Sequence, residues 1–152
     1  MKKSYLFLFV FILLFSCFGF AQQKGFGLGI IAGEPTGLSA KYFTSNGNAF
    51  DFGLGYSFTS SDNLLHLYID YIFHNKSLIQ SEENFTIYYG PGVRLKIRKE
   101  NSRLGARGVI GINWLPKDAP FDVFFELAPV LDLIPETRLD LSGGVGARYF
   151  FN

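Results

Sequence analysis

The sequence has little of what several classes of protein require. Its single cysteine, Cys17, excludes a disulfide framework and a thiolate metal site. Only 18% of the 152 residues are charged and the formal net charge is +1, so the chain lacks the basic excess of a nucleic-acid-binding module. Hydrophobic residues make up 48%, which excludes a disordered tail. These limits leave one apolar domain, with little room for a second.

The first 21 residues have the layout of a secretory signal peptide. Lys2 and Lys3 form a charged start, an uncharged apolar run follows, and Gly19 and Ala21 are the small residues expected before a cleavage site. We therefore predict that residues 1–21 are removed on export. Because two positive charges are lost with them, the formal net charge changes from +1 to −1.

Two other interpretations of this segment stay open. A surviving membrane anchor needs about 18 apolar residues or more, a length that the uncharged run barely reaches. A lipoprotein cut before Cys17 is indicated by residues 14–17, which are similar to a lipobox, although the bulky Phe15 disfavours it. After cleavage at the predicted signal peptide site, residues 22–152 form a single domain.

From residue 26 onward, apolar and polar residues alternate with a period of two. In the last segment, Leu139, Leu141 and Val145 fall on one face, while Asp140 and Arg148 fall on the other. Side chains alternate across a β-strand, so this pattern predicts a strand with one apolar and one polar face. The pattern recurs in eight segments: Phe26–Ala32, Leu38–Phe43, Phe50–Phe58, Leu65–His74, and those that begin at Phe85, Arg103, Phe121 and Arg138.

Connections rich in turn residues, such as Glu34–Gly37 and Lys99–Ser102, link these segments, and only Asn75–Asn84 is longer. Short turns join antiparallel neighbours, so the chain is predicted to be all-β, an eight-stranded antiparallel up-and-down β-barrel. Pro91 and Pro129 lie inside predicted strands. Each lacks a hydrogen-bond donor and a closed barrel has no free edge, so we expect β-bulges at both.

An eight-stranded barrel fits two opposite proteins, a soluble lipocalin-like barrel with an apolar cavity and a transmembrane barrel with an apolar outer face. Glycines on the polar face favour the second, since they make room in a narrow lumen. They are Gly25, Gly27, Gly29, Gly53, Gly55, Gly90, Gly92, Gly105, Gly111, Gly144 and Gly146.

The aromatic residues of the apolar face support the same choice. If the odd-numbered strands run outward from the periplasm, these aromatic residues gather at the periplasmic ends of the strands. We call this ring of aromatic residues the girdle; such a ring is typical of a membrane interface. The girdle residues are Phe26, Tyr42, Phe50, Phe52, Tyr71, Phe73, Phe85, Trp114, Phe121, Tyr149 and Phe151.

The signal peptide, the eight alternating strands and the aromatic-rich last strand Gly146–Phe151 resemble the small bacterial outer-membrane β-barrel proteins of the OmpA/OmpX type, as an uncharacterised subfamily. The resemblance implies a place in the outer membrane of a Gram-negative bacterium, surrounded by outer-membrane lipids. It also implies that the assembly machinery of that membrane reads the end of the last strand, through Tyr149 and Phe151.

The polar face would line the lumen, and its charges of both signs are in near balance. Ionised groups removed from water must be paired or hydrated, and neighbouring strands place Arg103 and Arg107 beside the acidic row Asp122, Glu126 and Asp132. The predicted lumen network is Lys41, Asp51, Asp70, Arg94, Arg103, Arg107, Asp122, Glu126, Asp132, Asp140 and Arg148.

An eight-stranded barrel leaves no wide channel, so we predict a mostly closed lumen and a structural or envelope-associated role. A narrow pore for ions or small solutes is the first alternative. A soluble periplasmic barrel that binds an apolar ligand is the second.

A basic cluster marks the outer end of one hairpin. Lys96, Arg98, Lys99 and Arg103 suit the phosphates of lipopolysaccharide. A solvated rim is the alternative interpretation, since a local charge cluster is common on exposed surfaces.

The sequence predicts no catalytic group, metal site or cofactor. His66, Asp70 and His74 share one face, but each step of four residues in a strand covers roughly 13 Å. This spacing is too long for one metal or one proton relay. We therefore expect that the protein is not an enzyme.

Overall fold

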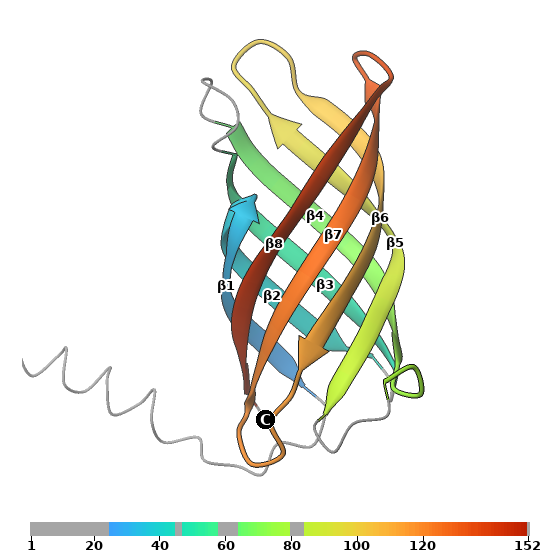
Figure 1. The fold of residues 1–152 in the computed structure, drawn as a ribbon. Helices are drawn as coiled ribbons and strands as arrows, with labels where there is room; N and C mark the ends of the chain where they lie inside the picture. Colours follow the sequence, from blue (N-terminus) through green and yellow to red (C-terminus); the bar gives the residue numbers. More distant parts are fainter. Residues whose placement is uncertain (1–24, 45–46, 58–63, 80–83, 152) are drawn as a thin grey trace, which may run out of the picture.

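The structure, a computed structural model, describes residues 25–44, 47–57, 64–79 and 84–151, in which eight strands form one closed antiparallel barrel (Figure 1). Each strand pairs with the next along the chain, and the last pairs with the first. The predicted fold class is therefore confirmed. The strands are β1 (Phe26–Glu34), β2 (Thr36–Phe43), β3 (Asn48–Ser57), β4 (Leu64–Asn75), β5 (Phe85–Ile97), β6 (Arg103–Trp114), β7 (Phe121–Ile134) and β8 (Arg138–Phe151).

The predicted signal peptide, residues 1–21, and Cys17 lie outside the described residues. Among the residues that are described, no helix is long and apolar enough to cross a membrane.

Alternation in the sequence decides which side chains face inward. In β7, every second residue from Asp122 to Asp132 is buried, whereas the residues between them are exposed. This is the period of an extended strand, and it gives the barrel a polar inner face and an apolar outer face. A smaller group of apolar side chains also points inward and packs within the barrel: Ile31, Ala49, Ile72, Tyr88, Val109, Phe124 and Ala128.

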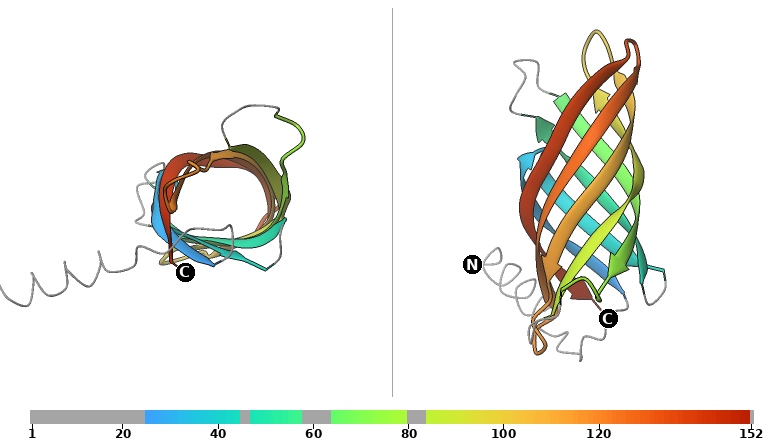
Figure 2. Two further views of the ribbon diagram at one scale, coloured as in Figure 1. Left: turned by 90° about the horizontal axis from the view of Figure 1, so that it is seen from below. Right: turned by 45° about the vertical axis from the view of Figure 1, so that its right-hand side comes forward.

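Both ends of the described chain lie at the same end of the barrel, because Phe26 in β1 pairs with Phe151 in β8 (Figure 2). We call this the terminal end and the opposite one the far end. The long connection between β4 and β5 is at the terminal end, and the connection between β5 and β6 is at the far end. The peptide bonds before Pro35 and Pro135, both in far-end turns, are cis.

The expected bulges at Pro91 and Pro129 are wrong. Pro91 pairs with Gly108, and Pro129 pairs with Leu141, in registers that continue unchanged on either side. Proline removes one donor from the ladder without adding a residue, so a lost hydrogen bond does not by itself shift the register.

A register shift occurs instead near the far end of β7. Leu104 pairs with Ile134, whereas Gly105 pairs with Asp132, which leaves Leu133 as an extra residue. Leu133 and Ile134 consequently both face outward, and Asp132 still points into the lumen.

Candidate functional site

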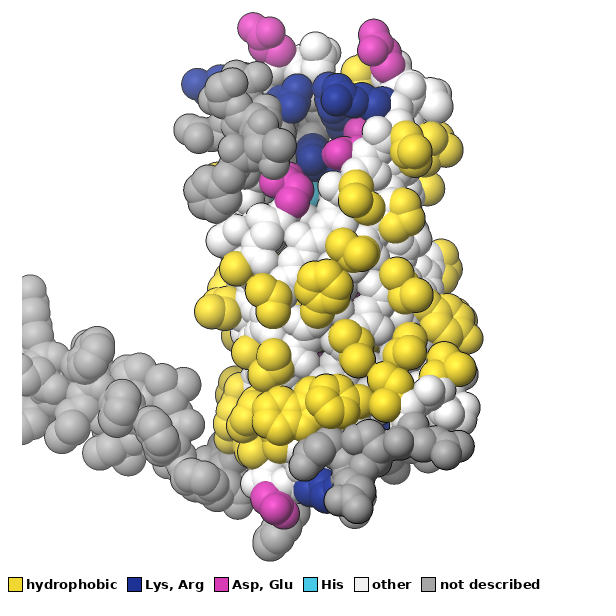
Figure 3. Space-filling model, viewed as in Figure 1, with side chains coloured by type: hydrophobic (Ala, Val, Ile, Leu, Met, Phe, Trp, Pro, Cys, Tyr) yellow, Lys and Arg dark blue, Asp and Glu magenta, His cyan; other side chains and the backbone are white. Residues whose placement is uncertain are grey.

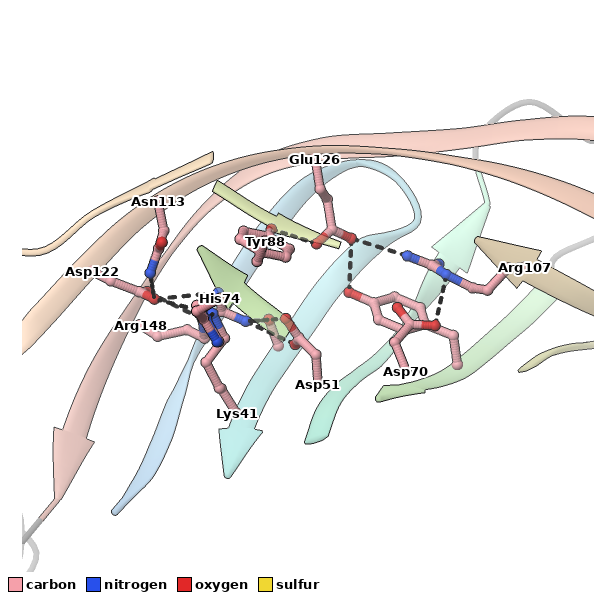
Figure 4. Close-up of polar contacts among 12 residues, drawn as sticks. Lys41, Asp51, Asp70, His74, Tyr88, Arg107, Asn113, Asp122, Glu126 and Arg148 are labelled. Atoms are coloured by element: carbon pink, nitrogen blue, oxygen red, sulfur yellow. Dashed lines mark hydrogen bonds and ion pairs between the residues drawn. The ribbon is translucent and has the colours of Figure 1, made fainter. Parts of the chain in front are cut away.

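The luminal charges form three clusters along the barrel, and we treat this lumen as the candidate site. The terminal-end cluster is centred on Arg148, which is fully buried. Its guanidinium group donates to Asp51 at 2.8 and 2.9 Å, to Asp122 at 3.1 Å, and to the Ser39 hydroxyl at 3.3 Å (Figure 4). Because β3 and β8 are not neighbours in the sheet, the contact with Asp51 crosses the lumen.

Lys41 adds a second buried cation to this cluster. Its Nζ lies 3.6 Å from Asp122 Oδ2, 3.5 Å from His74 Nε2, and 4.6 Å from the centre of the Tyr88 ring (Figure 4). Asn113 donates to Asp122 at 3.4 Å. Two cations, Lys41 and Arg148, thus balance the two carboxylates of the cluster, as burial requires.

The middle cluster joins four strands, β4 to β7, through Glu126. Its carboxylate accepts hydrogen bonds from Tyr88 at 2.9 Å, from Tyr68 at 3.3 Å and from Arg107 at 3.2 Å (Figure 4). The Nε of Arg107 also lies 3.0 Å from Asp70 Oδ1, and its guanidinium stacks 3.9 Å from the Tyr68 ring centre. The guanidinium group of Arg107 therefore contacts two buried carboxylates, those of Asp70 and Glu126.

The far-end cluster is centred on Arg94. This side chain, from β5, donates to Asp132 at 2.6 Å, and to Asp140 at 2.9 Å and Ser142 at 3.0 Å on β8. Lys96 Nζ lies 3.2 Å from Asp140. These contacts between β5 and β8 also cross the lumen, since the two strands are not neighbours.

Glu34 completes the far-end cluster from the end of β1. Its Oε1 lies 3.4 Å from Lys96 Nζ and 3.8 Å from His66 Nδ1, and it accepts a hydrogen bond from Ser57. Arg103 lies 3.9 Å from Asp132. The far-end cluster therefore holds three cations and three carboxylates.

Glycines on neighbouring strands make room for the large luminal side chains. Gly53 pairs with Tyr68, and Gly111 pairs with Tyr88. A Cβ atom on Gly53 would lie 2.0 Å from the Tyr68 ring, and one on Gly111 would lie 2.4 Å from the Tyr88 ring. Gly146 is in the same position relative to Phe124. The predicted function of inward glycines, to make room, follows from these contacts.

Outward-facing aromatic side chains encircle the terminal end. Cross-strand pairs join Phe26 to Phe151 and to Tyr42, and Tyr42 to Phe50, which lies 5.1 Å from Tyr71 between ring centres. On the face seen in Figure 3, apolar side chains form a band at this end, and more of the charged side chains lie at the far end. The girdle also contains Phe73, Phe85, Trp114, Phe121 and Tyr149.

The structure separates the residues of the predicted basic cluster. Lys96 is buried and bonded to Asp140 and Glu34, so it belongs to the lumen rather than to the rim. Lys99 is exposed in the turn after β5, and Arg98 and Arg103 are half-buried beside it.

The three candidate residues of β4 are also separated. His66 lies in the far-end cluster, Asp70 in the middle cluster, and His74 beside Lys41 in the terminal-end cluster. Within the described ranges, no group of three or more His, Cys, Asp or Glu side chains is placed to hold a metal ion.

Sequence reasoning missed several members of the clusters. Tyr68 and Tyr88 are on the polar face, and this position was the available signal for them. The membership of Glu34 in the far-end cluster could not be predicted from the alternation of polar and apolar residues. Strict alternation places it outward with Ala32, and it reaches the lumen only because β1 ends there.

No family model matches the chain, and neither does any curated protein. Among solved structures, the chain is similar to the crystal structure of the N-terminal β-barrel domain of Pseudomonas aeruginosa OprF. The TM-score is 0.60 and the sequence identity 14%, over 86% of this chain and 100% of that one. This likeness shows an OmpA-like barrel fold, and the expected resemblance to the OmpA type is confirmed at the level of the fold.

Proposed function

We propose that this chain is an integral outer-membrane protein of a Gram-negative bacterium, with a barrel that spans the membrane and a mostly closed, charged lumen. Its role would be structural or envelope-associated. The observation that carries the proposal is the inverted distribution of side chains: Lys41, Asp122 and Arg148 are fully buried, whereas Ile30 and Leu139 are among many exposed large apolar residues. A barrel in water would bury the second group, whereas a lipid-facing wall exposes it.

Strand length and the aromatic girdle support the same proposal. The strands have between 8 and 14 residues, and a tilted strand needs roughly 9 to 11 to cross a bilayer. The girdle is expected at the periplasmic interface, where aromatic rings contact lipid headgroups. In this orientation Tyr149 and Phe151 lie at the periplasmic end, where the assembly machinery would read them.

The first test is electrophoresis in SDS of the outer-membrane fraction, comparing unheated with boiled samples. A closed barrel resists SDS until it is heated, so we expect the protein in this fraction with a shift in mobility on boiling. Recovery in the soluble periplasm without a shift would reject the proposal and favour the soluble barrel.

A narrow pore is the second candidate, because polar side chains line the lumen from the terminal-end cluster to the far-end cluster. The pairs that cross the lumen favour closure instead. Planar-bilayer recording decides between the two: we expect no discrete current steps from well-folded protein, and reproducible steps would establish the pore.

Lipopolysaccharide is a proposed partner at the rim. Arg98, Lys99 and Arg103 lie at the rim after β5, where Arg103 also contacts Asp132 at 3.9 Å, whereas Lys96 lies in the lumen. We expect the triple glutamine variant to co-purify with less lipopolysaccharide than the unaltered protein. Unchanged co-purification would remove lipopolysaccharide from the proposal.

A further inference from the structure

The three luminal clusters differ in their balance of charge. The terminal-end cluster has two cations for two carboxylates, and the far-end cluster has three cations for three carboxylates. The middle cluster has one cation, Arg107, for the two carboxylates of Asp70 and Glu126 (Figure 4). The side chains of these two acids are 1% and 2% exposed. Among the described residues, the middle cluster therefore has one more carboxylate than it has cations.

The two carboxyl groups of the middle cluster have unequal hydrogen-bond partners. Glu126 accepts hydrogen bonds from Tyr68, Tyr88 and Arg107. Asp70 Oδ1 lies 3.0 Å from Arg107 Nε without the alignment of a hydrogen bond, and Asp70 Oδ2 has no hydrogen-bond partner among the described residues. Hydrogen bonds to a carboxylate stabilise its charged form. Asp70 is therefore the less stabilised anion of the two.

The strands on either side of Asp70 add no second cation for it. Asp51 lies directly opposite Asp70 on β3, and like charges in this position repel each other. Arg148 contacts Asp51 at 2.8 Å and so balances that carboxylate. On β5, Asp70 pairs with Gly92, where a Cβ atom would lie 1.8 Å from Asp70 Oδ1. The glycine makes room for the Asp70 carboxyl group but supplies no side-chain donor.

A buried carboxylate without a cation of its own is costly, and such a group becomes neutral by binding a proton. We propose that Asp70 Oδ2 is a proton-binding site, and that the folded barrel carries this proton at neutral pH. With Asp70 neutral, Arg107 balances Glu126, and none of the three clusters has a net charge. The site lies in the lumen and does not depend on the proposed membrane location.

This proton makes the stability of the barrel depend on pH. An aspartate in the unfolded chain is ionised at neutral pH, so folding takes up one proton from water at Asp70. Because the folded chain binds one more proton than the unfolded chain at this residue, raising the pH disfavours folding. The folding equilibrium constant falls about tenfold per pH unit from this cause, until Asp70 ionises in the folded barrel as well.

The first test is urea unfolding of the unaltered mature barrel and of Asp70→Asn in detergent micelles, at about pH 6 and at about pH 7. Asparagine has nearly the shape of a neutral aspartic acid and does not titrate. We therefore expect the ratio of the folding constants, variant to unaltered, to rise about tenfold between the two pH values. Asp140→Asn is the control, because Asp140 is paired with Arg94 and Lys96 and should give the same ratio at both.

The second test is infrared spectroscopy of the folded barrel at neutral pH. A protonated carboxyl group has a C=O band that an ionised carboxylate lacks. We expect one such band, which shifts when the barrel contains isotope-labelled aspartate and is absent from Asp70→Asn. Glu126→Gln should also remove the band, because Arg107 then has Asp70 as its one carboxylate and holds it ionised. A heat-dependent mobility shift shows that each variant is folded.

Three outcomes would overturn the inference. A ratio of folding constants that is the same at both pH values, with no carboxyl band from the unaltered protein, would show that Asp70 is ionised. A band that shifts with labelled glutamate instead of labelled aspartate would place the proton on Glu126. Lower stability when tetramethylammonium replaces sodium and potassium at equal ionic strength would show that a metal cation, rather than a proton, balances the middle cluster.

Discussion

Arg148 near the terminal end and Arg94 near the far end each bind two carboxylates, at least one of them across the barrel, but their surroundings differ. Both carboxylates of Arg148, on Asp51 and Asp122, are buried, whereas Asp140 beside Arg94 is 32% exposed. At the terminal end β8 pairs with both β7 and β1 around Arg148, while residues 138–142 at the far end pair only with β7. Asp140 lies in the stretch of β8 that pairs only with β7, and water therefore reaches it more readily than it reaches Asp51 or Asp122.

This difference in water access sets what each ion pair contributes to stability. A buried charge without its partner is strongly destabilising, because it can neither be hydrated nor be neutralised by a neighbour. A partly exposed charge regains water when its partner is removed, so the loss is small. The following variants test the comparison, from the largest expected effect to the smallest.

Replacement of Arg148 by methionine should be the most harmful change. It leaves Asp51 and Asp122 buried with Lys41 as their remaining cation, and we expect a loss of about 3–5 kcal/mol in the free energy of unfolding. Urea unfolding of the barrel, followed by tryptophan fluorescence, measures it. Arg138→Met, an exposed position on the same strand, is the control and should change stability by about 0.5 kcal/mol or less. Equal losses in the two variants would contradict the comparison.

Gly53→Ala should have the next largest effect. The new Cβ would lie 2.0 Å from the Tyr68 ring, so the tyrosine must move away from Glu126, and we expect a loss of about 1–3 kcal/mol. Gly108→Ala adds the same methyl group on the outer face, where nothing lies within 4 Å. Unfolding midpoints of the two variants should differ clearly, and a similar midpoint for both would show that the lumen is less tightly packed than described.

Asp140→Asn should have the smallest effect on stability. Arg94 keeps its 2.6 Å contact with Asp132, and the altered group is partly hydrated, so we expect a loss of about 1 kcal/mol or less. Added salt should reduce this loss further. Asp51→Asn is the buried counterpart and should show a larger, less salt-dependent loss in the same unfolding experiment. The reverse order would invalidate the contrast between the two ends.

Much of the barrel could be predicted from the sequence. The alternation in β7 and β8 correctly separates inward Asp122 and Arg148 from outward Leu127 and Leu139. The grouping of aromatic residues at one end also follows from the direction of each strand, since consecutive strands are antiparallel. Both predictions depend only on local geometry, which is the same in every strand.

The partners of the charges were harder to predict. Arg107 does contact Glu126 and Arg103 does lie near Asp132, as neighbouring strands suggest. Asp122, expected beside the same arginines, binds Arg148 on its other neighbouring strand, β8, and contacts Lys41 across the lumen. Contacts across the lumen depend on how far each strand is staggered against the next around the whole barrel.

The number and order of the strands, and the face on which most residues lie, follow from the sequence, because side-chain alternation and turn residues act over a few neighbouring positions. Only the closed barrel decided that Arg148 reaches Asp51 and that the Glu34 carboxylate contacts Lys96. These contacts depend on how all eight paired strands are staggered against one another, and no pattern within a single segment predicts that stagger.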